Sequence, residues 1–357
     1  MAFATGSASA QTKKPFDHAG LAKRALERHI QPGYSRLAQS ATELLRAASQ
    51  TCDKRGSSER KELEAAFDGF VEAWGRIEHI RFGPVTADNR LERILFWPDR
   101  RGIGARQVSR VLSRRDESVL DPAALAGKSV ALQGLTALDA VLFQKDGKAP
   151  DDAADRAYRC RFAAAIAGNL DRMAHDVSNA WSKAGGYSRY WLHPAAGNPH
   201  FVLPTETTLA LAKAYSEGSE RVRDERVGGP LGLNADRRRI PAVLSRSGRT
   251  MLLIDANIVG LTDLVTEGGL KDAILATTYK DRNVDTAASL KIIVEELDRA
   301  HAVSRRFREH RHPFEDKQVA GRLIAMGFPL KNARAQLGNL LALTADIAFG
   351  FNSSDGD

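Results

Sequence analysis

The apolar positions of this chain repeat with the period of an α-helix along almost its whole length. Residues 17–50 form a long amphipathic stretch with few helix-breaking residues. A second stretch, from Ser58 to Arg81, carries an apolar stripe at helical spacing, made of Phe67, Phe70, Val71, Trp74 and Ile77. Pro84 follows this stretch and cannot continue a helix. Further helices are predicted over residues 130–143, 151–184, 205–227, 247–267, 285–310, 315–326 and 331–349.

No segment alternates between apolar and polar residues as a half-buried strand would, so we expect an all-α fold. Two connections interrupt the helices. Residues 85–128 hold several arginines, glycines and prolines, and we expect short helical turns there. Long connections inside compact domains are often functional. Residues 185–204 are rich in glycine, proline and aromatic residues, which predicts a domain junction.

The predicted helix at Gln133 to Phe143 places a carboxylate on an apolar face. Its stripe is formed by Leu132, Leu135, Leu138 and Leu142, and both Thr136 and Asp139 fall on that stripe. An unpaired buried carboxylate costs free energy, so we expect a cation, a proton or a hydrogen-bond donor beside Asp139. Gly134, near the start of this helix, leaves room for another helix to approach.

A shortened copy of this helix returns later in the chain. The sequence Gly-Leu-Thr-Ala-Leu at 134–138 is echoed by Gly-Leu-Thr-Asp-Leu at 260–264. Each copy follows a helix that ends in Gly-Pro and then a linker, which is longer in the first half. This order predicts an internal duplication, with two up-and-down four-helix bundles over residues 14–190 and 191–357. Val265 stands where the first copy has Asp139, so the carboxylate belongs to the first bundle alone.

Composition narrows the function classes. The 357 residues suit two domains of about 150 residues each. No apolar run approaches the roughly 20 residues that span a bilayer, so we expect no transmembrane segment. The formal net charge is +8, but lysines and arginines are spread beside acidic residues without a basic block interleaved with aromatics. We therefore expect no nucleic-acid partner.

The N-terminus and the cysteines indicate export. Residues 2–10 are small and apolar, and Ala8-Ser9-Ala10 has the small-x-small form of a signal-peptidase site. We interpret residues 1–13 as a signal-peptide remnant with cleavage near Ala10, and a disordered arm is the alternative. Two cysteines in an exported protein, Cys52 and Cys160, favour one disulfide over two separate buried thiols.

The sequence carries no pattern that predicts catalysis. A zinc peptidase needs a ligand cluster such as His-Glu-x-x-His, and this is absent, as are the phosphate-binding glycine loops and the Gly-x-Ser-x-Gly elbow. Glu78 and His79 are adjacent and point to different sides of their helix. His310 and His312 lie beside a proline at a helix end. We assign no catalytic residue and favour a binding protein over an enzyme.

The candidates for binding are polar residues on buried-looking faces, in the long linker or at the C-terminus. Carboxylates and arginines mixed in this way suit either a divalent metal such as iron or a small anionic ligand. Glu78 and Asp139 are the metal candidates. The ligand candidates are Arg81, Arg93, Trp97, Asp99, Gln133, Thr136, Arg249, Asp255, Asn257, Asn352 and Asp355. The alternative is a set of buried salt bridges, for example between Asp139 and either Arg81 or Arg93.

Several motifs, taken in order, resemble those of the imelysin family. They are Trp74, Arg81-Phe-Gly-Pro-Val85, Phe96-Trp-Pro-Asp99, Leu132-Gln-Gly134, Ser247-Gly-Arg249 and the terminal Gly350-Phe-Asn-Ser-Ser-Asp-Gly-Asp357. In more detail, the chain resembles the branch of imelysin-like predicted periplasmic lipoproteins. The resemblance implies two related four-helix bundles, export to the periplasm and an association with iron uptake. Some members of the family have been classed as metallopeptidases.

The family's Gly-x-His-x-x-Glu signature, proposed as a metal site, corresponds to Gly134, Thr136 and Asp139 here. Threonine replaces the histidine and aspartate replaces the glutamate. Borderline divalent ions prefer imidazole to a hydroxyl, so we expect a modified or weakened site where Asp139 faces the 85–128 linker. No cysteine stands at the predicted mature N-terminus, which favours a soluble periplasmic protein. The functions rank as a binding or accessory protein of iron or metal uptake, an envelope scaffold with a protein partner, and an imelysin-type metallopeptidase.

Overall fold

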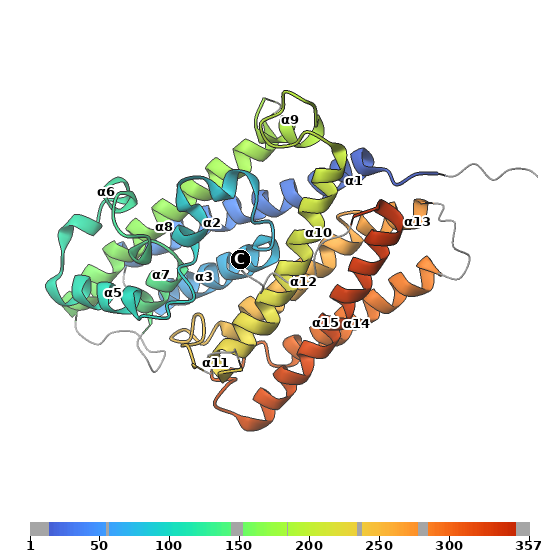
Figure 1. Ribbon diagram of the computed structural model, residues 1–357. Coiled ribbons are helices and arrows are strands. Elements are labelled where there is room, and N and C mark those ends of the chain that lie inside the picture. The colour runs from blue at the N-terminus through green and yellow to red at the C-terminus, as the bar shows by residue number, and fades with distance from the viewer. Residues whose placement is uncertain are drawn as a thin grey trace, which may run out of the picture.

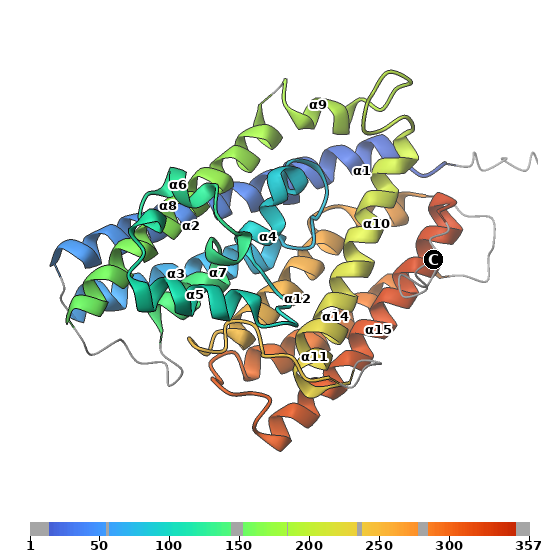
Figure 2. The ribbon, with the colours of Figure 1, turned by 60° about the vertical axis from the view of Figure 1, so that its left-hand side comes forward.

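The computed structural model describes residues 14–54, 57–143, 153–183, 185–233, 238–277 and 285–347. Every regular element in these ranges is a helix, which confirms the predicted all-α fold (Figure 1). The long helices form two groups that lie side by side in both views (Figures 1 and 2). Within the described ranges, no helix combines the length and the apolar character needed to cross a bilayer.

The first group contains α2 (Gln31–Lys54), α3 (Ser57–Ile77) and α8 (Ala153–Ser182). The chain enters α2 through α1 (His18–Ala25) and a π-helical segment, η1 (Leu26–Ile30). The stripe predicted for α3 forms the centre of this group, and each of its five side chains is at most 1% exposed. Helical periodicity was sufficient to find this core because the stripe is apolar over its whole length.

The long linker folds into short helices, as predicted. These are η2 (Gly83–Asn89), α4 (Arg90–Ile94), α5 (Ile103–Arg114), η3 (Glu117–Val119), α6 (Pro122–Ala126) and η4 (Val130–Leu132). They lead to α7 (Leu135–Leu142), so the helix predicted over 130–143 is interrupted at Gln133 and Gly134. A Cβ on Gly134 would lie 2.3 Å from the carbonyl oxygen of Ile94. The missing side chain therefore lets α7 begin directly against the backbone of α4.

The second group follows the short helix α9 (Tyr187–Leu192), which lies within the predicted junction. Its elements are α10 (Pro204–Glu220), the π-helical η5 (Arg221–Gly228), α11 (Gly229–Leu231), α12 (Thr250–Thr266), α13 (Leu270–Ala276), α14 (Thr286–Arg306) and α15 (Lys317–Ala345). The last is one helix where two were predicted. Pro329 lies inside it, and apolar residues on both sides of the proline, such as Met326 and Leu330, are buried. Packing of this continuous stripe outweighs the helix-breaking tendency of proline.

Helices α3 and α12 bring the two groups into contact. A Cβ on Gly260 would lie 2.2 Å from the carbonyl oxygen of Arg76, and a Cβ on Gly75 would lie 2.6 Å from the Cβ of Ala256. Glycine on each helix therefore permits the close approach. The echoed glycines Gly134 and Gly260 both face a neighbouring backbone, which accounts for that part of the repeat by packing. The duplication and the boundary between bundles stay predictions.

The predicted disulfide is present. Cys52 on α2 and Cys160 on α8 are bonded, with their Cα atoms 5.4 Å apart. The bond joins two neighbouring helices of the first group and closes a loop across a sequence separation of 108.

Removing this disulfide should destabilise the protein substantially. In the chain-entropy model, a loop of this length restricts the unfolded chain enough to contribute about 4 to 5 kcal/mol. We expect the double variant Cys52→Ser/Cys160→Ser to lose this amount in urea unfolding. Wild-type protein treated with a reductant serves as the control and should match the variant. A loss below about 1 kcal/mol in both samples would show that the unfolded chain is little affected by the cross-link.

Candidate functional site

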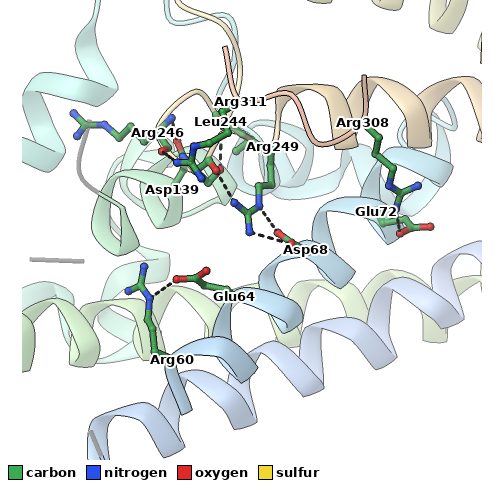
Figure 3. Close-up of polar contacts among 11 residues, drawn as sticks. Arg60, Glu64, Asp68, Glu72, Asp139, Leu244, Arg246, Arg249, Arg308 and Arg311 are labelled. Atoms are coloured by element: carbon green, nitrogen blue, oxygen red, sulfur yellow. Dashed lines mark hydrogen bonds and ion pairs between the residues drawn. The ribbon is translucent and has the colours of Figure 1, made fainter. Parts of the chain in front are cut away.

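Asp139 on α7 directs its carboxylate at the segment that precedes α12 (Figure 3). Its Oδ1 accepts the backbone N–H of Ser247 at 2.9 Å, and its Oδ2 accepts that of Arg246 at 3.2 Å. The side chain is buried, and burial raises the pKa of Asp139 while the hydrogen bonds from Ser247 and Arg246 oppose the rise. The expected partner of the buried carboxylate is therefore a pair of backbone amides.

Thr136, three residues earlier, has a different partner. Its hydroxyl donates to the carbonyl oxygen of Phe96 at 3.3 Å. Phe96 belongs to the long linker, so Thr136 faces that linker. The carboxylate of Asp139, which was predicted to face the linker, is instead held by residues 246 and 247. Neither Arg81 nor Arg93, the cations suggested from the sequence, forms an ion pair with Asp139 in the described part of the chain.

Guanidinium groups are concentrated around this carboxylate (Figure 3). Arg249 binds Asp68 of α3 through two hydrogen bonds of 2.7 and 3.1 Å, and it also donates to the carbonyl oxygen of Ser247. Arg311 donates to the backbone carbonyl of Arg246 at 3.4 Å. Among the described residues, the guanidinium of Arg246 itself has no hydrogen bond or ion pair. Its charge nevertheless favours the ionised form of Asp139 and lowers the pKa of that carboxyl.

The face of α3 that is turned toward these arginines carries a charged residue at every fourth position. Arg60, Glu64, Asp68 and Glu72 share this face because four residues make about one helical turn. Glu64 binds Arg60 at 2.6 Å, and Glu72 binds Arg308 at 2.6 Å (Figure 3). Together with the pair of Arg249 and Asp68, these contacts neutralise the acidic side chains of the face.

Glu78, the second metal candidate, has a separate set of partners just beyond the end of α3. Its Oε1 accepts from Nη2 of Arg226 at 2.6 Å, and its Oε2 accepts from Nδ2 of Asn257 at 3.0 Å. Glu78 is 3% exposed and Arg226 is 1% exposed. Burial alone would raise the pKa of Glu78, but the guanidinium groups of Arg226, Arg221 and Arg81 hold it below its ordinary value.

Trp97 completes this cluster. The guanidinium carbon of Arg226 lies 4.5 Å from the centre of the Trp97 ring, and the Trp97 Nε1 donates to the carbonyl oxygen of Pro241. Three predicted candidates from distant segments, Glu78, Trp97 and Asn257, thus meet around one arginine. Sequence reasoning did not select that arginine.

His79 has other hydrogen-bond partners than Glu78, its neighbour in the sequence. Its Nε2 lies 2.8 Å from the Nε2 of His29, which comes from the π-helical η1. Burial lowers the pKa of His79 well below its usual range and lowers that of His29 to about 4. Both imidazoles are therefore neutral at pH 7, and one donates the proton of the shared hydrogen bond.

The remaining candidates serve the fold. Arg93 donates to Gln133 at 2.8 Å and to Asn169 at 3.2 Å, which ties the long linker to α8. Asp99 accepts the N–H groups of Ile103 and Gly104 and caps α5. Asp255 accepts from Ser304 and Arg308. The backbone N–H of Arg81 donates to the carbonyl oxygen of His79, and the charges of Glu78, Glu92 and Glu225 act on its guanidinium. The candidates Asn352 and Asp355 lie outside the described residues.

The oxygen atoms of the metal candidates do not fit the divalent metal that the family signature implies. Both oxygens of Asp139 accept N–H groups, and Thr136 offers one hydroxyl that is already bonded. Glu78 is held by a guanidinium and an amide, both of which are donors that a cation would have to displace. Across the described ranges, no three His, Cys, Asp or Glu side chains gather in an arrangement able to hold a metal ion.

Comparison with known proteins identifies the family. The Peptidase_M75 (imelysin) family profile matches residues 30–325. An imelysin-like protein from Psychrobacter arcticum 273-4 has the same fold, with a TM-score of 0.75 and 17% identity over 94% of this chain and 99% of that one. An iron-regulated protein A precursor from Parabacteroides distasonis ATCC 8503 gives a TM-score of 0.72 and 13% identity, covering 93% and 97% of the two chains. No curated protein matches. The family profile covers most of the sequence, and the chain therefore belongs to the imelysin family.

Proposed function

We propose that this chain is an exported, non-enzymatic binding or accessory protein of iron uptake, and that it recognises an anionic iron chelate instead of a bare metal ion. The observation that carries the proposal is the bonding of Asp139, the residue that replaces the glutamate of the family signature. Its carboxylate accepts hydrogen bonds from backbone amides, while the guanidinium of the adjacent Arg246 forms no hydrogen bond or ion pair in the described part of the chain.

The surroundings of Asp139 favour an anion for electrostatic reasons. The carboxylates of Glu64, Asp68 and Glu72 each pair with an arginine. By contrast, neither Arg246 nor Arg311 forms an ion pair with a carboxylate among the described residues, and the charge of Arg246 acts on Asp139 without such a contact. Guanidinium groups bind carboxylates through paired, charge-assisted hydrogen bonds. A polycarboxylate chelate of iron would therefore supply the acceptors that these two arginines lack.

Export and the link to iron rest on separate observations. The Cys52–Cys160 disulfide suits an oxidising compartment such as the periplasm. Cleavage near Ala10 remains a proposal because that segment lies outside the described residues. The link to iron is supported by the name of one structural relative, an iron-regulated protein A precursor.

Ferric citrate titration of the purified chain tests the proposal. Losing charge-assisted hydrogen bonds worth about 1.5 to 3 kcal/mol should weaken binding by about 10- to 100-fold in the variant Arg246→Ala/Arg311→Ala. The control is Arg299→Ala, which removes an exposed arginine from the outer face of α14 and should leave affinity unchanged. The proposal fails if ferrous or zinc ions bind without a chelator and Asp139→Ala abolishes that binding.

A second candidate function is that of an envelope scaffold with a protein partner. It is favoured by exposed apolar side chains around a groove between η5 and α15, which has a volume of about 180 Å³. Phe328 is 67% exposed, Leu233 57% and Ile324 42%. Phe328→Asp should then abolish co-purification with an envelope protein from native membranes. Ile292→Asp, at a residue on α14 that is 44% exposed, should not.

A further inference from the structure

A small polar cavity lies where the end of α3 meets α10, η5 and α12. It is lined by Glu78, His79, Gly218, Arg221, Asn257 and Leu261. It gives the centre of a water-sized molecule about 10 Å³ to move in. Three of these residues are almost fully buried, with exposures of 3% for Glu78, 5% for His79 and 7% for Asn257. The site therefore lies between the two groups of helices, and its polar side chains come from both.

Three polar atoms of the lining have no hydrogen-bond partner on the described protein. They are Oδ1 of Asn257, Nη1 of Arg221 and Nδ1 of His79. The orientation of the Asn257 amide is fixed because its Nδ2 donates to the carbonyl oxygen of Gly75 and to Glu78. Its Oδ1 must then be an acceptor without a donor, and Arg221 contributes a donor without an acceptor. Buried polar atoms are nearly always satisfied in folded proteins.

We infer that this cavity holds one ordered water molecule, which donates to Oδ1 of Asn257 and accepts from Nη1 of Arg221. The free volume matches the roughly 10 to 15 Å³ that a single water requires. A water can serve His79 Nδ1 in either tautomer, because it both donates and accepts. One molecule therefore satisfies polar atoms from α12, η5 and the end of α3.

Other small occupants fit the lining less well. A halide would accept from Arg221, but it would also face the carboxylate of Glu78 and the carbonyl oxygen of Asn257. A cation would face the guanidinium of Arg221, whose neighbour Arg226 already neutralises Glu78. Only an occupant that can donate to Oδ1 of Asn257 and also accept from Nη1 of Arg221 satisfies these two atoms. Water is the smallest molecule with that property.

The water has a role in joining the two groups of helices. Arg221 opens the π-helical η5, and π-helical segments in other proteins often occur at functional sites. His79 continues the polar chain to His29 on η1, the other π-helical segment. The water thus completes a hydrogen-bonded path from η1, through the end of α3, to η5 and α12.

A crystal structure of the full chain, grown in sodium bromide and measured at the bromine absorption edge, tests this inference. We expect one oxygen-sized peak within hydrogen-bond distance of Asn257 Oδ1 and Arg221 Nη1, without anomalous signal. An anomalous peak would identify a halide and overturn the inference. A cavity without density, in which His79 and Asn257 have turned toward each other, would overturn it as well.

A solution measurement complements the crystal. Oxygen-17 relaxation dispersion counts long-lived internal waters, and Gly218→Ala should remove the contribution of one of them. The added Cβ would enter the lining, 3.0 Å from the Cβ of His79 and 2.8 Å from Leu261. Gly321→Ala is the matched control, since a Cβ there meets nothing within 4 Å. Equal dispersion in both variants and the wild type would contradict an ordered water at this site.

Discussion

Replacing Glu78 with glutamine should lower the free energy of unfolding by about 3 to 5 kcal/mol, because it leaves the guanidinium of Arg226 buried without a counter-charge. The pair is 2.6 Å apart, and its side chains are only 4% and 1% exposed. Burial lowers the pKa of Arg226 while Glu78 opposes this change, so the carboxylate is what makes the buried cation tolerable. Urea unfolding at pH 7 measures the loss.

An exposed pair gives the matched control. Glu295 on α14 lies within 4 Å of Lys291 and Arg299, and its side chain is 46% exposed. Ion pairs of this kind contribute about 0 to 1 kcal/mol, so Glu295→Gln should change stability little. Replacing both members of the buried pair, as in Glu78→Gln/Arg226→Met, should recover part of the loss. If Glu78→Gln costs no more than Glu295→Gln, the buried pair is not the stabilising feature assigned here.

Features of the fold could be predicted from the sequence where a single physical rule determines them. The α3 stripe from Phe67 to Ile77 is apolar at every helical turn, so periodicity alone located the core. The pairing of Cys52 with Cys160 followed from having only two cysteines in a chain with the marks of export. The need of Asp139 for a partner followed from the cost of burying a charge. In each case a local pattern determined the outcome.

The partners themselves could not be predicted, because they depend on backbone geometry that residue types do not encode. Asp139 is satisfied by backbone N–H groups, which every residue except proline carries. Arg221 and Arg226 are five residues apart, and in an α-helix they would point about 140° away from each other. The π-helical η5 changes that relation and brings both into the Glu78 cluster. No sequence signal available here marked the π-helical segment.

Stability should fall steeply between pH 7 and pH 5 because of the buried pair of His29 and His79. Burial lowers the pKa of His29 from 6.5 to about 4 and holds that of His79 well below its ordinary value. The unfolded chain therefore binds protons below about pH 6.5 while the folded chain does not, so protonation favours unfolding. Each histidine contributes a slope of about 1.4 kcal/mol per pH unit below its unfolded pKa of about 6.5, so the pair loses about 4 kcal/mol by pH 5.

The contribution of His29 and His79 to the pH dependence can be separated from that of the other groups whose pKa is shifted. Burial also lowers the pKa of His18, so His18 adds to the loss, whereas the raised pKa of Asp139 opposes it. The lowered pKa of Glu78 acts only below its ordinary value of 4.5. The variant His29→Leu/His79→Leu should therefore flatten the urea-unfolding profile between pH 7 and pH 5, whatever its stability at pH 7. His312→Gln changes a histidine whose side chain is 48% exposed and should retain the wild-type slope. Equal slopes in the two variants would mean that the buried imidazoles take up protons without unfolding, and that the path from η1 to η5 tolerates a charge.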